Sequence, residues 1–309
     1  MELVRPAQYT GMADASGAVA VNSNLFIVAD DESNALRLYS REHGGAPLKE
    51  FDCNAFLEVT GKSPEADLEA GARIGDRAFW IGSHGRNRDG KVRPNRCRFF
   101  ATQIEARGDD VRLTPVGRPY KRLLDDFLAE PRLAHFHLRE ASELAPKQSG
   151  ALNIEGLSAT PEGHLLIGFR NPIPEDRALL VPLLNPNDLI EGRPAQFGDP
   201  ILLGLDGLGI RDIAWHAGEY IIIAGANHGG GPFELFRWTG NGSAPQRIKV
   251  NHFNRYHPEA IVIYPDRGLH EFQILSDDGT ESIGGIPAHE VTDWSKRAFR
   301  SFWLTQERD

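Results

Sequence analysis

The most informative pattern in this chain is a short hairpin plan that recurs along the sequence. In residues 152–171, LNIEGLSATPEGHLLIGFRN, Glu155 precedes a Pro-Glu-Gly turn, and the apolar run Leu165–Ile167 follows the turn. Proline, glycine and acidic residues favour turns for steric and hydrogen-bonding reasons. A turn of this kind between two apolar segments predicts a β-hairpin.

Four further copies of the plan start at Ser16, Glu69, Asp212 and Glu259. In three of the five copies the starting acid lies 13 residues before a glycine. The five starts are separated by 53, 86, 57 and 47 residues. Repeats of about 40–50 residues that contain several short strands are typical of β-propellers. The sequence therefore predicts an all-β propeller with five blades, with six blades as the alternative.

The ends of the chain and its longest interval complete the predicted architecture. A closed propeller leaves no blade with an unpaired edge, so we expect the strand Val4–Thr10 to complete the blade of Phe299–Thr305. Between about 118 and 148 the sequence predicts a small helical insertion, because Leu123, Leu124 and Phe127 recur at helical spacing. We expect this apolar stripe to pack against the disc. The whole chain, residues 1–309, is interpreted as a single propeller domain.

Composition and charge exclude several classes of protein. The contents of 32 glycines and 20 prolines suit many short strands joined by turns. The net charge of −9 argues against a general nucleic-acid scaffold. Cys53 and Cys97 fit neither a disulfide framework nor a zinc motif. The start shows no secretion signal and no stretch is long enough to span a bilayer. We therefore expect a soluble, cytoplasmic protein without membrane or nucleic-acid partners, and the sequence leaves its oligomeric state open.

The first strand of each predicted blade opens with a pair of residues two apart, whose side chains point the same way. These pairs are Asp14/Ser16, Asp67/Glu69, Asn153/Glu155, Ile210/Asp212 and His257/Glu259. Because the first strands of a propeller line its central channel, the acids are expected to converge on the axis. The predicted metal ligands are Glu69, Glu155, Asp212, Glu259 and Asp14. Carboxylates suit a hard divalent cation, Ca²⁺ first, with Mg²⁺ or Mn²⁺ as alternatives. The competing interpretation pairs the acids with arginines such as Arg73 and Arg211 and makes the ring structural.

The loops between the second and third strands are expected on the same face as these acids. Arg86 and Arg170 are predicted to bind an anionic substrate, together with Asn171, Asn227 and Arg211. His84 or His228, each beside glycine, is predicted to act as acid or base, and Glu155 is included among the catalytic candidates. Each histidine can equally be an ordinary hydrogen-bonding group, and the arginines can simply neutralise the acids.

Several long segments resemble a bacterial family known as domain of unknown function 3616. They are FIVADDESNALRLY, IGDRAFWIGSHGRNRDGKVRPNR, LNIEGLSATPEGHLLIGFRNP and LGIRDIAWHAGEYIIIAG. More distantly, the Glu155-Gly156-Leu157 start with its Pro-Glu-Gly turn resembles the blade openings of esterase-like phytase and gluconolactonase-type propellers. That resemblance implies an axial divalent cation and hydrolysis of phosphate or lactone esters. Those families generally have six blades, so none of their ligands is transferred to this chain.

Together these patterns predict a metal-dependent hydrolase of a small anionic substrate, a phosphoester or lactone, acting at the channel mouth. The alternative is a non-catalytic propeller that binds a ligand or partner through the same face. A third hypothesis is a nucleotide or nucleic-acid contact through the basic loop Arg86–Arg98.

Overall fold

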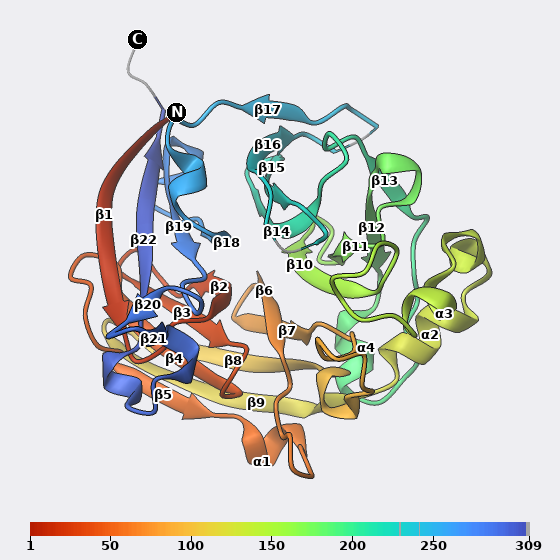
Figure 1. Cartoon of the computed structure of the whole chain (residues 1–309), viewed down its shortest axis with the longest axis horizontal. Helices are drawn as coiled ribbons and strands as arrows, with labels where there is room; N and C mark the ends of the chain where they lie inside the picture. Colours follow the sequence, from red (N-terminus) through yellow and green to blue (C-terminus); the bar gives the residue numbers. More distant parts are fainter. Residues whose placement is uncertain (229, 241, 307–309) are drawn as a thin grey trace.

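Five four-stranded antiparallel sheets form a ring around a central axis (Figure 1). The computed structural model describes residues 1–228, 230–240 and 242–306. The protein is a five-bladed β-propeller, as the repeat spacing predicts, and the six-bladed alternative is wrong. None of the helices in these described ranges is long and apolar enough to cross a membrane.

Each of the first four blades is made of consecutive strands that run from the axis to the rim. Blade 1 contains β2 (Ala15–Ala20), β3 (Leu25–Asp30), β4 (Ala35–Ser40) and β5 (Lys49–Asp52). Blade 2 contains β6 (Leu68–Ile74), β7 (Arg77–Gly82), β8 (Phe99–Arg107) and β9 (Asp110–Tyr120). Blade 3 contains β10 (Asn153–Ala159), β11 (Leu165–Asn171), β12 (Ala178–Leu183) and β13 (Ile201–Leu203). Blade 4 contains β14 (Gly209–His216), β15 (Glu219–Gly225), β16 (Phe233–Trp238) and β17 (Gln246–Ile248).

Blade 5 joins the two ends of the chain. It contains β18 (Pro258–Val262), β19 (Glu271–Ser276), β22 (Ala298–Thr305) and, at its rim, β1 (Glu2–Thr10). β1 pairs antiparallel with β22, from Glu2 opposite Thr305 to Thr10 opposite Ala298. The predicted closure by the N-terminal strand is therefore confirmed.

A buried polar network reinforces this closure. The side-chain amide of Gln273 donates to the Tyr9 hydroxyl at 3.1 Å and to the Ser301 hydroxyl at 2.8 Å. The Tyr264 hydroxyl donates to the amide oxygen of the same glutamine at 2.7 Å. Tyr9 also stacks on Phe299, with ring centroids 5.1 Å apart. One fully buried side chain thus connects β1, β19, β22 and the segment after β18.

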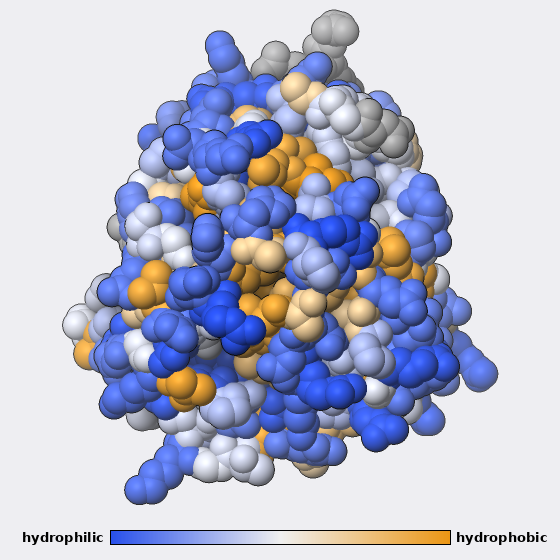
Figure 2. Space-filling view, turned by 90° about the vertical axis from the view of Figure 1, so that its right-hand side faces the viewer, coloured by the Kyte–Doolittle hydropathy of each residue, from blue (hydrophilic) through white to orange (hydrophobic). Residues whose placement is uncertain are grey.

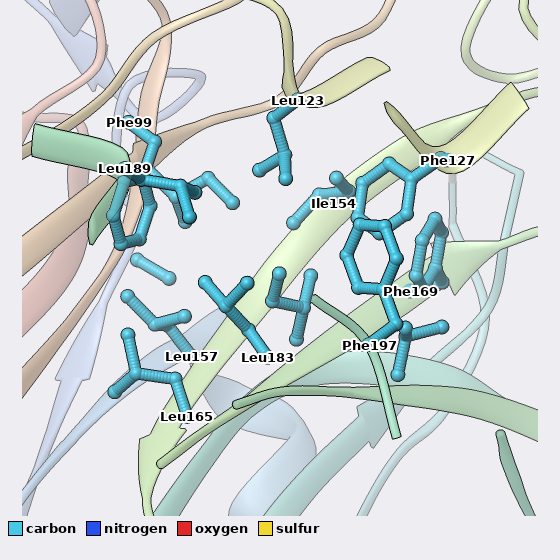
Figure 3. Close-up of a cluster of buried hydrophobic side chains, with 14 of the residues drawn as sticks. Phe99, Leu123, Phe127, Ile154, Leu157, Leu165, Phe169, Leu183, Leu189 and Phe197 are labelled. Carbon is cyan, nitrogen blue, oxygen red and sulfur yellow. The ribbon is translucent and has the colours of Figure 1, made fainter. Parts of the chain in front are cut away.

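The helical insertion packs against blades 2 and 3. It contains α2 (Leu123–Ala129), a 3₁₀ turn (Pro131–Phe136) and α3 (Leu138–Ala141). Phe127 lies against Phe169 and stacks on Phe197, with centroids 4.8 Å apart (Figure 3). The insertion is expected from about residue 118, but β9 continues to Tyr120 and the first helix begins at Leu123, where its apolar pattern begins. Seen from the side that carries α2 and α3, the surface is mostly hydrophilic (Figure 2), so the apolar stripe is used in packing, as expected.

The remaining elements are short and lie in the connections. They are α1 (Asn54–Leu57), α4 (Pro186–Ile190), β20 (Ser282–Ile283), β21 (Ile286–Pro287) and the 3₁₀ turns Pro94–Arg96, Pro174–Asp176, Phe253–Arg255, Gly268–His270, Ala288–Glu290 and Trp294–Lys296.

Glycines allow the inner strands to approach one another closely. A β-carbon added at Gly17 would lie 2.6 Å from the Ala70 backbone of the next blade. Added at Gly156 or Gly168, it would lie 2.7 or 2.8 Å from the Ile210 side chain of the blade that follows. Since real β-carbons do not come so close, these positions require glycine, and the channel near them is narrow.

We expect Gln273→Leu to destabilise the closure of the ring. The substitution leaves the hydroxyl groups of Tyr264 and Ser301 without their buried partner, which costs about 1–3 kcal/mol for each such group. Denaturant unfolding of the variant should show a lower midpoint, whereas the exposed control Gln246→Leu should unfold like the parent protein. Equal midpoints for the two variants would show that the network does not hold blade 5.

Candidate functional site

A β-bulge or register irregularity near the start of the first hairpin in all five blades places a side chain apart from the regular ladder. In blade 2, Glu69 lies between the paired residues Leu68 and Ala70 and has no partner across the hairpin. Glu259 has the same position in blade 5, and Glu155 lies at the irregular start of blade 3. Bulges commonly re-aim a side chain beside a functional site.

These three glutamates meet at the axis. Their carboxylate oxygens lie within 4.8 Å of one another. Glu155 and Glu259 are buried, with 2% and 3% of their surface exposed, while Glu69 is partly exposed. The sequence therefore predicts correctly that acids from blades 2, 3 and 5 converge.

Blade 4 contributes Arg211 to this position, and the structure places Asp212 elsewhere. The bulge of blade 4 falls on Arg211, between the pairs that begin at Ile210 and Asp212. The Asp212 carboxylate accepts hydrogen bonds from the backbone N–H of Ile213 at 2.8 Å and of Ile261 at 2.7 Å. It joins the inner strands of blades 4 and 5 and does not face the three glutamates.

The equal spacing of 13 residues hides this difference, because the glycine does not occupy the same place in every ladder. In blade 2, Gly82 pairs with Leu68, the residue just before the bulge at Glu69. In blade 4 that place belongs to Ala224, which pairs with Ile210, and Gly225 lies one residue further on. The acid counted back from Gly225 is therefore Asp212, one residue past the bulge.

Two arginines neutralise two of the three glutamates. Arg211 Nη1 lies 2.9 Å from Glu155 Oε2, and Arg211 Nε donates to Glu259 Oε2 at 3.0 Å. Arg170 Nη1 donates to Glu155 Oε1 at 2.8 Å, as does the Asn153 amide at 2.6 Å. Glu155 and Glu259 are therefore paired with arginines, as the structural interpretation of the acidic ring expects.

Asp30 and Asp67 pair with Arg37 and Arg96, but four further acids of the channel mouth lack such partners. We define the open acidic group as Asp14, Asp31, Glu69 and Asp277. Asp14 is only 7% exposed, yet its Oδ2 atom has no hydrogen-bond partner among the described residues, and neither has Asp31 Oδ1. Glu69 makes no hydrogen bond or ion pair within the same ranges, and Asp277 Oδ1 accepts only the N–H of Gly279 at 3.0 Å.

Burial and mutual repulsion shift the titration of this group. Burial raises the pKa of Asp14 to about 8, and the charge of Asp277 adds to the shift. Burial also holds the pKa of Asp31 well above its usual value, with repulsion from Asp14 and Glu69. Desolvation raises the pKa of Glu69 and of Asp277 as well. The group is therefore short of positive charge, which a bound cation would supply.

Asp14 belongs to the predicted set, whereas Asp31 and Asp277 were missed. Both lie in loops that follow the second strand of a blade, β3 and β19. Their signal in the sequence is a pair of adjacent aspartates after an apolar strand, Asp30-Asp31 and Asp277-Asp278. The loops were expected on the correct face, but their acids were not included among the candidates.

The structure does not bring the predicted histidines to the glutamates. His84 is 2% exposed, its Nδ1 atom lies 2.8 Å from the Gly82 carbonyl, and its Nε2 atom has no partner among the described residues. Burial lowers the pKa of His84 to about 4, and the charge of Arg98 acts in the same direction. His228 is exposed at the surface.

Most of the predicted substrate-binding residues have structural contacts. Arg86 Nε donates to the Ser142 carbonyl at 2.9 Å and its Nη1 to Gly90 at 3.0 Å, which fastens the basic loop to the insertion. The buried amide of Asn171 donates to the Gln148 carbonyl at 2.8 Å and so holds the other end of the insertion. Asn227 is partly buried beside Ala226, whose carbonyl accepts Arg170 Nε at 3.1 Å. Only Arg170 and Arg211 of this set lie at the acids.

The fold and this site define a five-bladed propeller with an acidic axial mouth. Residues 116–265 match the family model described as "Protein of unknown function (DUF3616)", which confirms the resemblance seen in the sequence. No curated protein sequence matches the chain.

Several solved structures are similar in fold. Glutaminyl cyclase from Myxococcus xanthus has 13% sequence identity and a TM-score of 0.52, over 99% of this chain and 97% of that one. A GH43 β-1,3-galactosidase bound to galactodeoxynojirimycin has 11% identity and a TM-score of 0.52, over 96% and 91%. An exo-β-1,3-galactanase from Clostridium thermocellum has 11% identity and a TM-score of 0.50, over 99% and 62%. At such identities the likeness concerns the fold alone.

We expect Arg211→Gln to destabilise the protein by about 3–5 kcal/mol, because it leaves buried carboxylates without their cation. The loss should be larger at pH 8 than at pH 5, where protons can neutralise Glu259, since burial raises its pKa to about 8. Denaturant unfolding at both pH values measures this loss of stability, with the exposed Arg107→Gln variant as the control. A loss that is equal at both pH values would contradict the assignment of Arg211 as counter-ion.

Proposed function

We propose that the open acidic group holds a divalent cation, Ca²⁺ first, and that the protein is a hydrolase of a small anionic substrate at this mouth. The substrate class is a phosphoester or a lactone. One observation carries the proposal. Two buried carboxylate oxygens, on Asp14 and Asp31, have no partner among the described residues, in a group of acids with raised pKa values.

The residues of the group fit a hard cation. Ca²⁺ takes six to eight oxygen ligands in a flexible geometry, which aspartates and water can provide. Asp14, Asp31 and Asp277 would hold it together with water, since their carboxylates are not all within 4.8 Å of one another. Glu69 stays free beside the ion, while Arg170 and Arg211 keep Glu155 and Glu259 occupied. A cation here supplies Lewis acidity toward the scissile group and toward water.

Substrate binding and proton transfer are assigned to side chains at or beside the open acidic group. Arg170 is 14% exposed, and its second terminal nitrogen makes no hydrogen bond to the described residues. It is the arginine available to bind a substrate anion. Glu69, partly exposed and without a partner in the described ranges, is our candidate for the general base. Glu155 has both oxygens engaged, so we assign it to positioning Arg170 and Arg211. The acid–base roles of His84 and His228 stay predictions.

The comparisons support catalysis only in outline. The similar structures named above include a cyclase, a galactosidase and a galactanase by their names, so folds similar to this one occur in enzymes. A non-catalytic binding module remains the second candidate. Arg211 lies between Glu155 and Glu259 and bonds to both, so these two acids stabilise the ring and are not available for catalysis.

Metal content and calorimetry test the cation. Protein purified without chelator should contain about one Ca²⁺, Mg²⁺ or Mn²⁺ per chain by mass spectrometry, because the three aspartates with water form one site for one ion. Asp31→Asn and Asp14→Asn should each lose it, whereas Glu162→Gln, an exposed acid on a hairpin turn, should keep it. Absence of metal together with no thermal shift on adding divalent cations would remove the cation and the hydrolase that depends on it.

The same site gives a defined pH dependence. Folding raises these pKa values from about 4 to about 8 for Asp14. The stability that protonation contributes is therefore complete at acid pH and lost as the pH rises toward 8. Chelator-treated protein should lose thermal stability over this window, and added Ca²⁺ should restore it because the ion replaces the protons. In Asp31→Asn this pH-dependent loss of thermal stability should be smaller than in the control variant Glu162→Gln.

Kinetics test the hydrolase. We expect cation-loaded protein to hydrolyse chromogenic phosphoesters or lactones, and Glu69→Gln to lower kcat about 10²–10⁴-fold, the usual effect of removing a general base. Arg170→Lys should mainly raise KM, because it removes the planar donor that faces the substrate anion. No turnover by metal-loaded protein that still binds these compounds would favour the binding module.

A further inference from the structure

The channel has a second opening, at the end opposite the acidic mouth. A cavity of about 580 Å³ is lined by residues from all five inner strands, β2, β6, β10, β14 and β18. Along β14 the lining starts at Asp212, one residue beyond Arg211, and continues to Trp215. Along β2 it continues to Ser23, in the turn before β3. The cavity thus extends from the level just past the glutamates to the hairpin turns of the other face.

Small side chains make this end hollow. Ala18, Ala20, Ala72, Ala159 and Ala214 line the wall, together with Gly71 and Gly75. Larger apolar groups come from Ile213, Trp215, Ile261 and Ile263. The volume is that of a small-molecule site, and polar and apolar groups share its lining about equally.

The titratable groups of the lining are an acid, Asp212, whose pKa burial raises to about 8, and a base, Arg73. A cation beside Asp212 would favour its ionised form. The Asp212 carboxylate accepts one backbone N–H on each oxygen, which fixes its orientation and leaves further lone pairs. Arg73 is committed elsewhere. Its Nε atom donates to the Gly75 carbonyl at 2.7 Å, and its Nη1 to Ala20 and Val21 at 2.9 and 2.5 Å. Among the described residues, the cavity offers an acceptor for a cation and no free base for an anion.

We propose that this cavity binds a small organic cation, a protonated amine on an apolar body. The ammonium group donates to Asp212 at the inner end, and the body lies against Trp215 and Ile263. Trp215 contributes further through attraction between a cation and its ring. The excess of carboxylates around the axis and the net charge of −9 favour entry of a cation into the channel. The site is separate from the acidic mouth and independent of the hydrolase proposal.

Calorimetric titration of the full chain with three matched probes tests the site. The probes are 2-phenylethylamine, its neutral analogue 2-phenylethanol and the anion 3-phenylpropionate. We expect the amine to bind at least tenfold more tightly than the alcohol, and the anion more weakly than both. Equal affinity for amine and alcohol, or no binding of the amine, overturns the proposal.

Two variants locate the binding. Ala214→Leu fills the cavity without touching Asp212 and should abolish binding of both amine and alcohol. Asp212→Asn should reduce amine affinity at least tenfold and leave the alcohol within twofold. If Asp212→Asn fails to fold, because the Ile261 N–H loses its acceptor, Ala214→Leu decides alone. Unchanged amine binding in Ala214→Leu contradicts the site.

A control excludes binding at the other end of the channel. Asp31→Asn removes one acid of the open acidic group and should leave amine affinity unchanged, and Ca²⁺ should not displace the amine. Loss of amine binding in Asp31→Asn would assign the amine to the acidic mouth and overturn the proposal for the cavity. The same result would leave the cation test of the hydrolase unaffected, since that test rests on metal content.

Discussion

The guanidinium group of Arg211 is the contact on which the axis of this propeller depends. It comes from blade 4 and bonds to Glu155 of blade 3 and Glu259 of blade 5. Both acids are buried, and a buried carboxylate without a counter-charge is costly. Five inner strands that glycines allow to pack closely would otherwise bring only negative charge to the centre. Arg211, at the bulge of blade 4, supplies the positive charge that allows the buried acids of this closely packed ring to ionise.

The position of this arginine also divides the mouth into unlike halves. On one side, Arg211 forms ion pairs with Glu155 and Glu259, and Arg170 forms one with Glu155. On the other side, Asp14, Asp31, Glu69 and Asp277 have raised pKa values, and buried oxygens of Asp14 and Asp31 have no hydrogen-bond partner among the described residues. The arginines on that side, Arg37 and Arg96, pair with the neighbouring acids Asp30 and Asp67 instead. The asymmetry is therefore the physical reason to look for a ligand beside Asp31 and not at Glu155.

The sequence predicts the architecture well because the repeat is a property of whole blades. Spacing gives the number of blades, and the need to remove an open edge predicts the pairing of Val4–Thr10 with Phe299–Thr305, which the structure contains. The site depends on single residues, where spacing is a weaker guide. Asp212 replaces Arg211 in the prediction because Gly225 lies one residue further along its ladder than Gly82 does, although each follows an acid by 13 residues. Asp31 and Asp277 lie in loops that carry no repeat, so only the fold reveals that they face Asp14.

Arg211 and Asp212 also show how one strand separates two environments. They are neighbours in β14, so their side chains leave the strand in different directions. Arg211 lies among the glutamates of the mouth, and Asp212 lines the cavity at the other end. The bulge at Arg211 sets this division, since moving it by one residue would exchange the two side chains. The acid would then join three glutamates of which only Glu155 keeps a counter-ion, Arg170, and the guanidinium would enter the cavity. The observed register is the one in which each charge has a partner or an opening to water.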